Sequence, residues 1–410
     1  MTSEQFIWVW LPGASEPVVC GRVWQDSGVY LVQYGRSYLS RSDAVPLFGM
    51  PLGEDVLSPP AGMTLHGALR DGLPDAWGQH VILARMLGRS GRDADPEELD
   101  ALAYMRESNS DRFGAIDFQA SPTYYVARQE PTTLDDLADA ARALEEGRRL
   151  PPSLDAALTH GTSIGGARPK ATLVDGDRVH WIAKFSSTSD GGLPRVRHEA
   201  LGLHLARAAG VVTVDGRLAT AADRDVLLVR RFDRRPRGTR VMAVSGLTML
   251  ALDEMVGRYA TYPEMLDVLR AYAVDPEAVG HELFRRIAVN IVLGNTDDHA
   301  RNHAALWDGR HLVLSPAYDI DPCRSPGWDA NQAMAYGREG ERRSNLKGLL
   351  GTAAVYSLNQ QQARAIIDHV MASVTERWSE ALDAARLTQT EGDHLLGSRV
   401  LNPAVLDGLS

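Results

Sequence analysis

The spacing of apolar residues predicts strands in the first part of the chain and helices in the last part. Stretches rich in Val, Tyr and Trp, separated by Gly and Pro, are typical of strands. They occur near the start and again in a β-rich region from about residue 171 to 240, and from about residue 246 the chain is predicted to be mainly helical. The predicted strands are 6–10, 18–24, 29–39, 179–185 and 225–232.

Helices are predicted where apolar residues recur every three or four positions. The helix 282–293 carries Leu283, Ile287 and Ile291 on one stripe. Gly88 and Gly210 are placed to end the helices 76–87 and 198–209. The other predicted helices are 93–105 and 132–149, with an irregular connection at 46–60 and a Pro-Pro linker at 151–152.

This order of elements predicts an α+β fold with a β-rich N-terminal part and an all-helical C-terminal lobe. A chain of 410 residues is expected to form two or three domains. We expect a β-rich start followed by helices in 1–150, a β/α region with a Gly-rich turn in 151–245, and a helical lobe in 246–410. Two lobes with a cleft between them would suit a nucleotide.

Composition narrows the class of protein. The chain is 44% hydrophobic and 23% charged, as in ordinary globular proteins, and it has no apolar run long enough to span a bilayer. Its first residues do not resemble a signal peptide, so we expect a cytoplasmic protein with no membrane association. Two cysteines cannot form a disulfide framework or a zinc site. A net charge of −10 argues against nucleic-acid binding over the whole surface and leaves a local patch or a partner open.

The residues with the clearest chemistry lie directly after the apolar helix 282–293. Asp297 precedes Asn302 by five positions, which is the spacing of a kinase catalytic loop, with Thr296 in place of its Arg. An acid and an amide on one loop can serve proton transfer and bind a metal ion. Asp319 follows about twenty residues later, after the apolar segment 312–317, where a carboxylate could hold Mg²⁺.

A Gly-rich turn at 163–170 is a second candidate. Gly165 and Gly166 would let the backbone approach phosphate oxygens, and Arg168 and Lys170 supply positive charge. The turn does not match the Walker A spacing, and an ordinary turn remains the alternative.

Lys184, at the end of the predicted strand 179–185, is in the position of a phosphate-binding strand lysine. Glu199, on the next predicted helix, is its candidate partner, and the alternative is a lysine that reaches solvent. Residues 230–234 fall where a hinge between lobes is expected, so their backbone could contact adenine. A solvated basic hairpin is the alternative for that segment.

A transition-metal site is the main rival interpretation of the acidic loop. His299 and His303 are four residues apart and lie next to Asp297 and Asp298. This interpretation leaves Lys184 and the Gly-rich turn unexplained. We therefore interpret His299 as a residue that hydrogen-bonds the loop and holds its shape.

The motifs together resemble the HipA family of serine/threonine kinase toxins from bacterial toxin–antitoxin pairs. The matching segments are 163–170, Lys184, 229–234, 295–302 and 318–319. The N-terminal part is also similar, since residues 72–78 look like the "LLPDGWG" stretch of the family. The chain departs from the family pattern at Asn295 and Asp298, and at Arg230, where an acid is often found.

This resemblance implies a two-lobed, protein-kinase-like fold that binds ATP and Mg²⁺. Asp297 would be the catalytic base, Asn302 and Asp319 the Mg²⁺ ligands, and Ser163 the site of an inactivating autophosphorylation. Lys184 would bind the ATP phosphates, and Phe232 with its neighbours would line the adenine site. The residues expected to contact the nucleotide are Ser163, Gly165, Gly166, Ala167, Lys170, Lys184, Arg231, Phe232, Asp233, His299 and Asn302.

The resemblance also implies partners. We expect a small helix-turn-helix antitoxin of the HipB type, operator DNA contacted mainly through it, and a translation-related substrate such as an aminoacyl-tRNA synthetase. Two other functions remain open: a corepressor that binds nucleotide without transferring phosphate, and a metal-dependent phosphohydrolase that uses His299 and His303.

Overall fold

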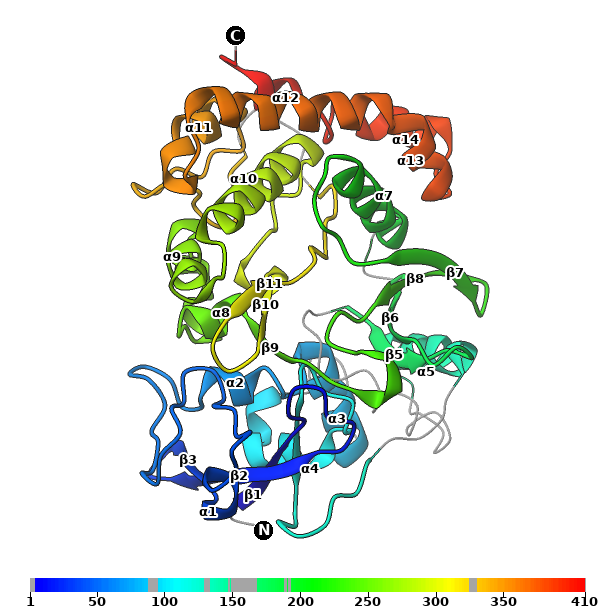
Figure 1. Ribbon diagram of the computed structural model, residues 1–410. Coiled ribbons are helices and arrows are strands. Elements are labelled where there is room, and N and C mark those ends of the chain that lie inside the picture. The colour runs from blue at the N-terminus through cyan, green and yellow to red at the C-terminus, as the bar shows by residue number, and fades with distance from the viewer. Residues whose placement is uncertain are drawn as a thin grey trace. The chain divides into compact units, whose positions relative to one another are not determined.

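The structure is a computed structural model that describes residues 4–87, 95–128, 133–146, 148, 168–187, 190, 193–323 and 330–409 (Figure 1). The chain divides into two compact units. Unit 1 comprises Met1–Gly192, Ala219–Asp253 and Leu306–Arg310, and unit 2 comprises Leu193–Leu218, Glu254–Ala305 and His311–Ser410. The three predicted domain ranges stay a prediction.

Unit 1 begins with a four-stranded sheet of order β3-β2-β1-β4, in which neighbouring strands are antiparallel. The predicted strand 29–39 is wrong beyond residue 34, where the short helix α1 follows. Tyr34 and Tyr38 are four residues apart, and the helical turn stacks their rings 5.9 Å apart. The elements here are β1 Glu4–Val9, β2 Val18–Asp26, β3 Val29–Tyr34, α1 Arg36–Leu39, α2 Gly67–Arg70, α3 Ala76–Leu87, a 3-10 helix Pro96–Glu98, α4 Ala101–Glu107 and β4 Ile116–Gln119.

The predicted helix 76–87 is confirmed as α3, whereas the predicted helix 93–105 is broken. Asp100 has an extended backbone, and its side chain accepts a hydrogen bond from the Ala103 N–H, 2.7 Å away. An N-cap of this kind begins a new helix, so α4 is separate from the 3-10 turn before it.

The second sheet of unit 1 has the order β5-β6-β8-β7. The predicted helix 132–149 is confirmed as α5, on which Leu137, Ala138 and Ala141 are buried in one core cluster with Ala183 and Val226 of the sheet. Burial of one apolar face is what holds an otherwise polar helix on a sheet. The elements are α5 Leu134–Glu145, β5 Lys170–Val174, β6 His180–Phe185, β7 Gly216–Ala221, β8 Arg224–Arg230, β9 Met242–Ser245 and α8 Gly246–Met249.

Unit 2 is built around helix α10, Pro276–Leu293, which packs against α9 and α12. Figure 1 shows α12 crossing the top of this unit above α10. The predicted helix 282–293 begins six residues earlier because Asp275 accepts a hydrogen bond from the Ala278 N–H at 3.0 Å and Pro276 fits the first turn. Two short strands, β10 and β11, interrupt the predicted helical part. The other elements are α7 Arg195–Ala208, a 3-10 helix Glu254–Tyr259, α9 Tyr262–Tyr272, a 3-10 helix Ala300–Asn302, β10 Ala304–Trp307, β11 Leu312–Leu314, α11 Leu346–Gly351, a 3-10 helix Ala353–Tyr356, α12 Gln360–Glu376, α13 Trp378–Ala384, α14 Gln389–Leu395 and α15 Pro403–Leu406.

None of the helices in the described ranges has both the length and the apolar character that crossing a membrane would require.

Candidate functional site

The acidic loop begins where α10 ends in unit 2. Gly294 has φ 69°, a left-handed conformation that glycine adopts without strain, and it caps the helix. The next residue returns to the helix, because the Asn295 N–H donates to the Asn290 carbonyl oxygen at 2.9 Å. The end of a buried helix therefore sets where the loop starts.

Asp297 and Asn302, which are five positions apart, contact each other within the acidic loop. The Asn302 side-chain Nδ2 donates to the Asp297 carbonyl oxygen at 3.3 Å, and its backbone N–H donates to His299 O at 2.8 Å. Asn302 is buried, whereas Asp297 is exposed. A carboxylate that faces outward from a hydrogen-bonded loop can meet a substrate hydroxyl.

Asp298 lies in the middle of the loop with its side chain buried, and its Oδ2 accepts three hydrogen bonds. The donors are the Tyr262 hydroxyl, Asn290 Nδ2 at 2.6 Å and His303 Nε2 at 2.9 Å. All four side chains are buried. Burial, and then the neighbouring Asp298 carboxylate, raise the pKa of Tyr262 well above its usual value, so its hydroxyl keeps the proton that it donates.

Thr296 and Arg301 of the loop also contact other segments of unit 2. The Thr296 carbonyl oxygen accepts a hydrogen bond from Ala333 N at 3.1 Å, and the Tyr318 hydroxyl donates to Arg301 O at 2.9 Å. Arg301 also forms an ion pair with Glu254. Backbone groups along the loop are therefore held by segments distant in sequence.

Asp319, the second predicted Mg²⁺ ligand, lies on a neighbouring segment after β11. It has a left-handed backbone, with φ 60°, which is uncommon for a residue other than glycine. Its carbonyl oxygen is 3.5 Å from Asn295 Nδ2, a long contact at the start of the acidic loop. A small cavity of about 10 Å³ is lined by residues of both segments, among them Asn302, His303, Tyr318 and Ile320.

The two histidines of the rival metal site have different surroundings. His303 is buried and donates from Nε2 to Asp298, so this nitrogen is already engaged. His299 is half-buried. Over the described ranges, no three His, Cys, Asp or Glu side chains group in a way that could hold a metal ion.

In unit 1, Lys184 lies on β6, half-buried and opposite Lys170 of β5 in the antiparallel register. Lys170 is buried and forms an ion pair of 2.9 Å with Asp75, whose carboxylate also accepts a hydrogen bond from Gly78 N in the first turn of α3. The structure thus gives Lys170 a structural partner, and its contact with a nucleotide stays a prediction. Glu199 belongs to α7 of unit 2, and its pairing with Lys184 also stays a prediction.

The predicted hinge residues Arg231 and Asp233 lie in a buried ion-pair network. Arg231 contacts Asp111 at 2.9 Å and Asp233 at 2.7 Å, and Arg234 contacts the same two carboxylates at 2.7 and 3.0 Å. Burial acts to raise the pKa of Asp233, but Arg231 and Arg234 outweigh it and lower the pKa to about 2. The side chains of Arg231, Asp233 and Arg234 therefore form ion pairs within the protein. Phe232 is half-buried, and its ring makes an edge contact with Phe113.

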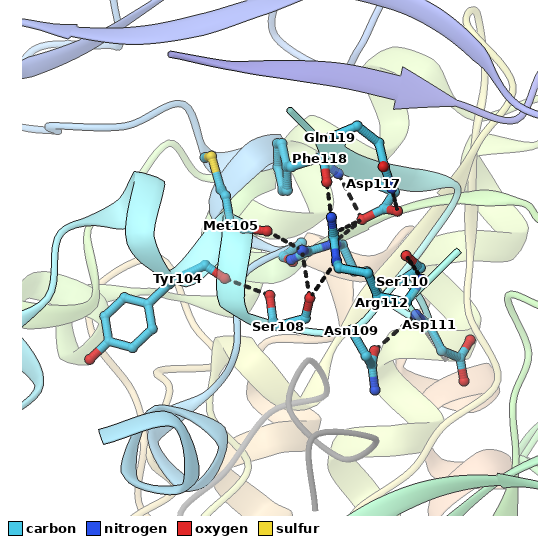
Figure 2. A network of polar contacts seen from close by, with 12 residues as sticks. Tyr104, Met105, Ser108, Asn109, Ser110, Asp111, Arg112, Asp117, Phe118 and Gln119 are labelled. Carbon is cyan, nitrogen blue, oxygen red and sulfur yellow. Dashed lines mark hydrogen bonds and ion pairs between the residues drawn. The ribbon is translucent and has the colours of Figure 1, made fainter. Parts of the chain in front are cut away.

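A third buried arginine, Arg112, stabilises the segment that carries Asp111. Figure 2 shows the Arg112 guanidinium between the Asp117 carboxylate and the Met105 carbonyl oxygen, each 2.6 Å from a nitrogen. Arg128 also contacts Asp117, at 3.0 Å. The alternative of a solvated basic hairpin does not describe Arg231 and Arg234, which are buried and paired with Asp111 and Asp233.

Part of the predicted site lies outside the described residues: Ser163, Gly165, Gly166 and Ala167. Arg168 is the first residue of the Gly-rich turn among the described residues. It is exposed, and its Nε is 3.7 Å from Asp190 Oδ1.

A family model for a HipA-like C-terminal domain matches residues 162–378. The chain belongs to this family. The match includes the acidic loop, Asp319 and Lys184, so the resemblance predicted from the motifs is confirmed.

Two individual proteins are similar to this HipA-like chain. A protein of Sinorhizobium fredii named "Putative kinase Y4mE" is 27% identical over 231 residues, which cover 51% of this chain and 54% of that protein. The chain therefore spans about half the length of this relative. The HipA chain of Shewanella oneidensis, solved with HipB and operator DNA, has 17% identity and a TM-score of 0.67, covering 95% of this chain and 94% of that one. This likeness confirms the predicted α+β, HipA-type fold.

The sequence interpretation did not identify the anchors of the loop. Asn290 is a polar residue in the otherwise apolar stretch 287–293, a signal that could have marked it as a buried hydrogen-bonding group. Tyr262 is 36 positions from Asp298 and carries no comparable signal.

Proposed function

We propose that this HipA-like protein is an ATP- and Mg²⁺-dependent protein serine/threonine kinase and the toxin of a toxin–antitoxin pair. One observation carries the proposal: Asp297 is exposed on a loop that is hydrogen-bonded to Asn302 and anchored below by buried Asp298. Family membership supports it, because the match covers the segments with the predicted catalytic residues.

Asp297 acts as the catalytic base. Its exposed carboxylate accepts the proton of a substrate serine or threonine hydroxyl as that oxygen attacks the γ-phosphorus. The bond from the γ-phosphorus to the bridging oxygen breaks, and ADP leaves. Phosphoryl transfer depends mainly on positioning and charge neutralisation, so a fixed loop suits this reaction.

Asn302 and Asp319 are the residues that would hold Mg²⁺. The Asn302 Nδ2 donates into the loop, which leaves its Oδ1 as the oxygen for a cation, and Asp319 supplies a carboxylate. Hard cations prefer such oxygen ligands, so the residues fit the ion. When bound, Mg²⁺ neutralises charge on the phosphates.

Unit 1 contributes nucleotide contacts in this proposal. Lys184 binds the phosphates, and Phe232 and the backbone of its neighbours Arg231 and Asp233 line the adenine site. Lys170 and the Gly-rich turn, with Ser163, Gly165, Gly166 and Ala167, are assigned to the phosphates by family resemblance, and His299 is assigned to the nucleotide in the same way.

Ser163 is the proposed autophosphorylation site. A phosphate adds nearly two negative charges at neutral pH, which the acidic metal-binding residues would repel. Mass spectrometry of active protein is expected to find phosphate on Ser163, and phosphate confined to other residues would contradict this assignment.

The proposed partners are a HipB-like helix-turn-helix antitoxin, operator DNA bound through it, and a cytoplasmic protein substrate that serves translation, such as an aminoacyl-tRNA synthetase. The structure of the Shewanella HipA with HipB and operator DNA supports the first two by analogy. The net charge of −10 is consistent with DNA contact through a partner.

Incubation with ATP labelled on the γ-phosphate, with Mg²⁺, separates the kinase from its two alternatives. A kinase yields labelled protein. A silent corepressor binds ATP and leaves both protein and free phosphate unlabelled, and a phosphohydrolase releases labelled phosphate without labelling protein.

A further inference from the structure

Asp298 is tightly held, although no step of the proposed reaction uses it. Tyr262, Asn290, Asp298 and His303 have exposed fractions of 0%, 4%, 4% and 3%. The three partners all donate to the same carboxylate oxygen, Oδ2. A buried carboxylate is costly unless hydrogen bonds compensate it, and hydrogen bonds to an ionised acceptor are among the strong ones.

The three donors come from three different segments. Tyr262 is the first residue of α9, Asn290 lies in the last turn of α10, and His303 follows the acidic loop directly. Asp298 therefore links the middle of the loop to two helices of the core and to the end of the loop itself.

Asp297 and Asp298 are adjacent but have opposite environments, since the first is exposed and the second is buried. A shared backbone joins them, so the anchoring of one carboxylate limits where the other can lie. We infer that Asp298, held by Tyr262, Asn290 and His303, is a positioning residue that fixes Asp297 for phosphoryl transfer. This inference rests on the proposed kinase function.

The Tyr262→Phe substitution tests this role, because it removes one hydroxyl and keeps the ring. Tyr356→Phe is its matched control. Tyr356 is also fully buried in unit 2, and its hydroxyl donates to the Tyr336 carbonyl oxygen at 2.6 Å rather than to the loop. Both variants lose one buried hydrogen bond, so both are expected to lower the melting temperature.

The readout is the rate at which the full-length chain incorporates label from γ-labelled ATP, measured against ATP concentration. Tyr262→Phe is expected to lower the maximal rate about tenfold, with less than about a twofold change in the half-saturating ATP concentration. Tyr356→Phe is expected to change both quantities by less than about twofold. A purely structural role would lower stability in both variants without this difference in maximal rate.

Substitutions at Asp298 give a second measurement. Asp298→Asn keeps an oxygen acceptor of similar size, whereas Asp298→Ala removes every hydrogen bond. We expect the maximal rate to fall about 100-fold in Asp298→Ala and by a smaller factor in Asp298→Asn, while a fluorescent ATP analogue binds both with little change.

The wild type separates failure of the inference from failure of the function. If the wild-type chain incorporates no label, the kinase proposal itself is wrong. If the wild-type chain is labelled, two results would show that Asp298 does not position Asp297. The first is that Tyr262→Phe and Tyr356→Phe have the same maximal rate. The second is that Asp298→Asn and Asp298→Ala retain the wild-type rate.

Discussion

Asp233 accepts hydrogen bonds from Arg231, Arg234 and the Gly114 backbone, with donor–acceptor distances between 2.7 and 3.0 Å. Both arginines also contact Asp111. A buried charge of this kind is tolerated only while its partners are present. Within unit 1, Asp111 and Gly114 therefore help to fix residues 231–234, which include the proposed adenine contacts.

Asp233→Asn is expected to destabilise the protein by about 3–5 kcal/mol, because it leaves two buried arginines short of a counter-charge. Asp267→Asn is the matched control, since Asp267 also pairs with an arginine but is half exposed, and such pairs are worth at most about 1 kcal/mol. Denaturant unfolding would measure both. Equal losses would contradict the structural importance of the buried network.

At the residue scale, the sequence predicted arrangements between residues that are close together in the chain. The five-residue spacing of Asp297 and Asn302 predicted that one short loop carries both residues, and their hydrogen bond is local to that loop. Tyr262, one partner of Asp298, and Asp75, the partner of Lys170, lie 36 and 95 positions away in the chain, and residue spacing holds no information on such pairs. Their geometry had to come from the fold.

At the scale of elements, helix α7 supports the segment that carries Asp319. Gly202 lies on the buried side of α7, and a Cβ atom added there would lie 2.0 Å from the Ile320 carbonyl oxygen. Only a residue without a side chain allows this approach. The backbone next to the proposed Mg²⁺ ligand is therefore set by helix packing.

Gly202→Ala is expected to lower the melting temperature and to raise the Mg²⁺ concentration that gives half-maximal labelling, because Ile320 and its neighbour Asp319 must shift. Gly351→Ala is the control, since Gly351 ends α11 with open space around its Cβ position. That variant should keep the wild-type Mg²⁺ dependence. An unchanged Mg²⁺ requirement in Gly202→Ala would show that α7 does not position the ligand.

Elements with a long apolar stripe were predicted well, and short ones were not. Helices α3 and α10 follow their periodicity, and the start of α10 was missed because Asp275 and Pro276 act through capping rather than hydrophobicity. Strands β10 and β11 have only four and three residues, too few to show alternation. The helical turn after β3 was misassigned because Tyr38 and Leu39 resemble the Tyr- and Leu-containing strand before them, although the polar residues Arg36 and Ser37 lie between.

For the whole molecule, family membership and the α+β fold were predictable because several motifs occur in a fixed order along the chain. The net charge of −10 argues against nucleic-acid binding over the whole surface. The identities of the proposed substrate and antitoxin could not be predicted from the order of the motifs or from the net charge. Recognition of a partner depends on surfaces outside the matched motifs. The central claim at this scale is that the protein transfers phosphate from ATP with Asp297 as base.

Comparison of the wild type with Asp297→Asn tests that claim most directly. The initial rate of label transfer from γ-labelled ATP to protein should fall at least about 100-fold in the variant, because a positioned base contributes on that order. Binding of a fluorescent ATP analogue should stay within about a factor of two, since Asp297 is not a nucleotide contact in this account. Transfer that persists in Asp297→Asn at the wild-type rate would contradict it.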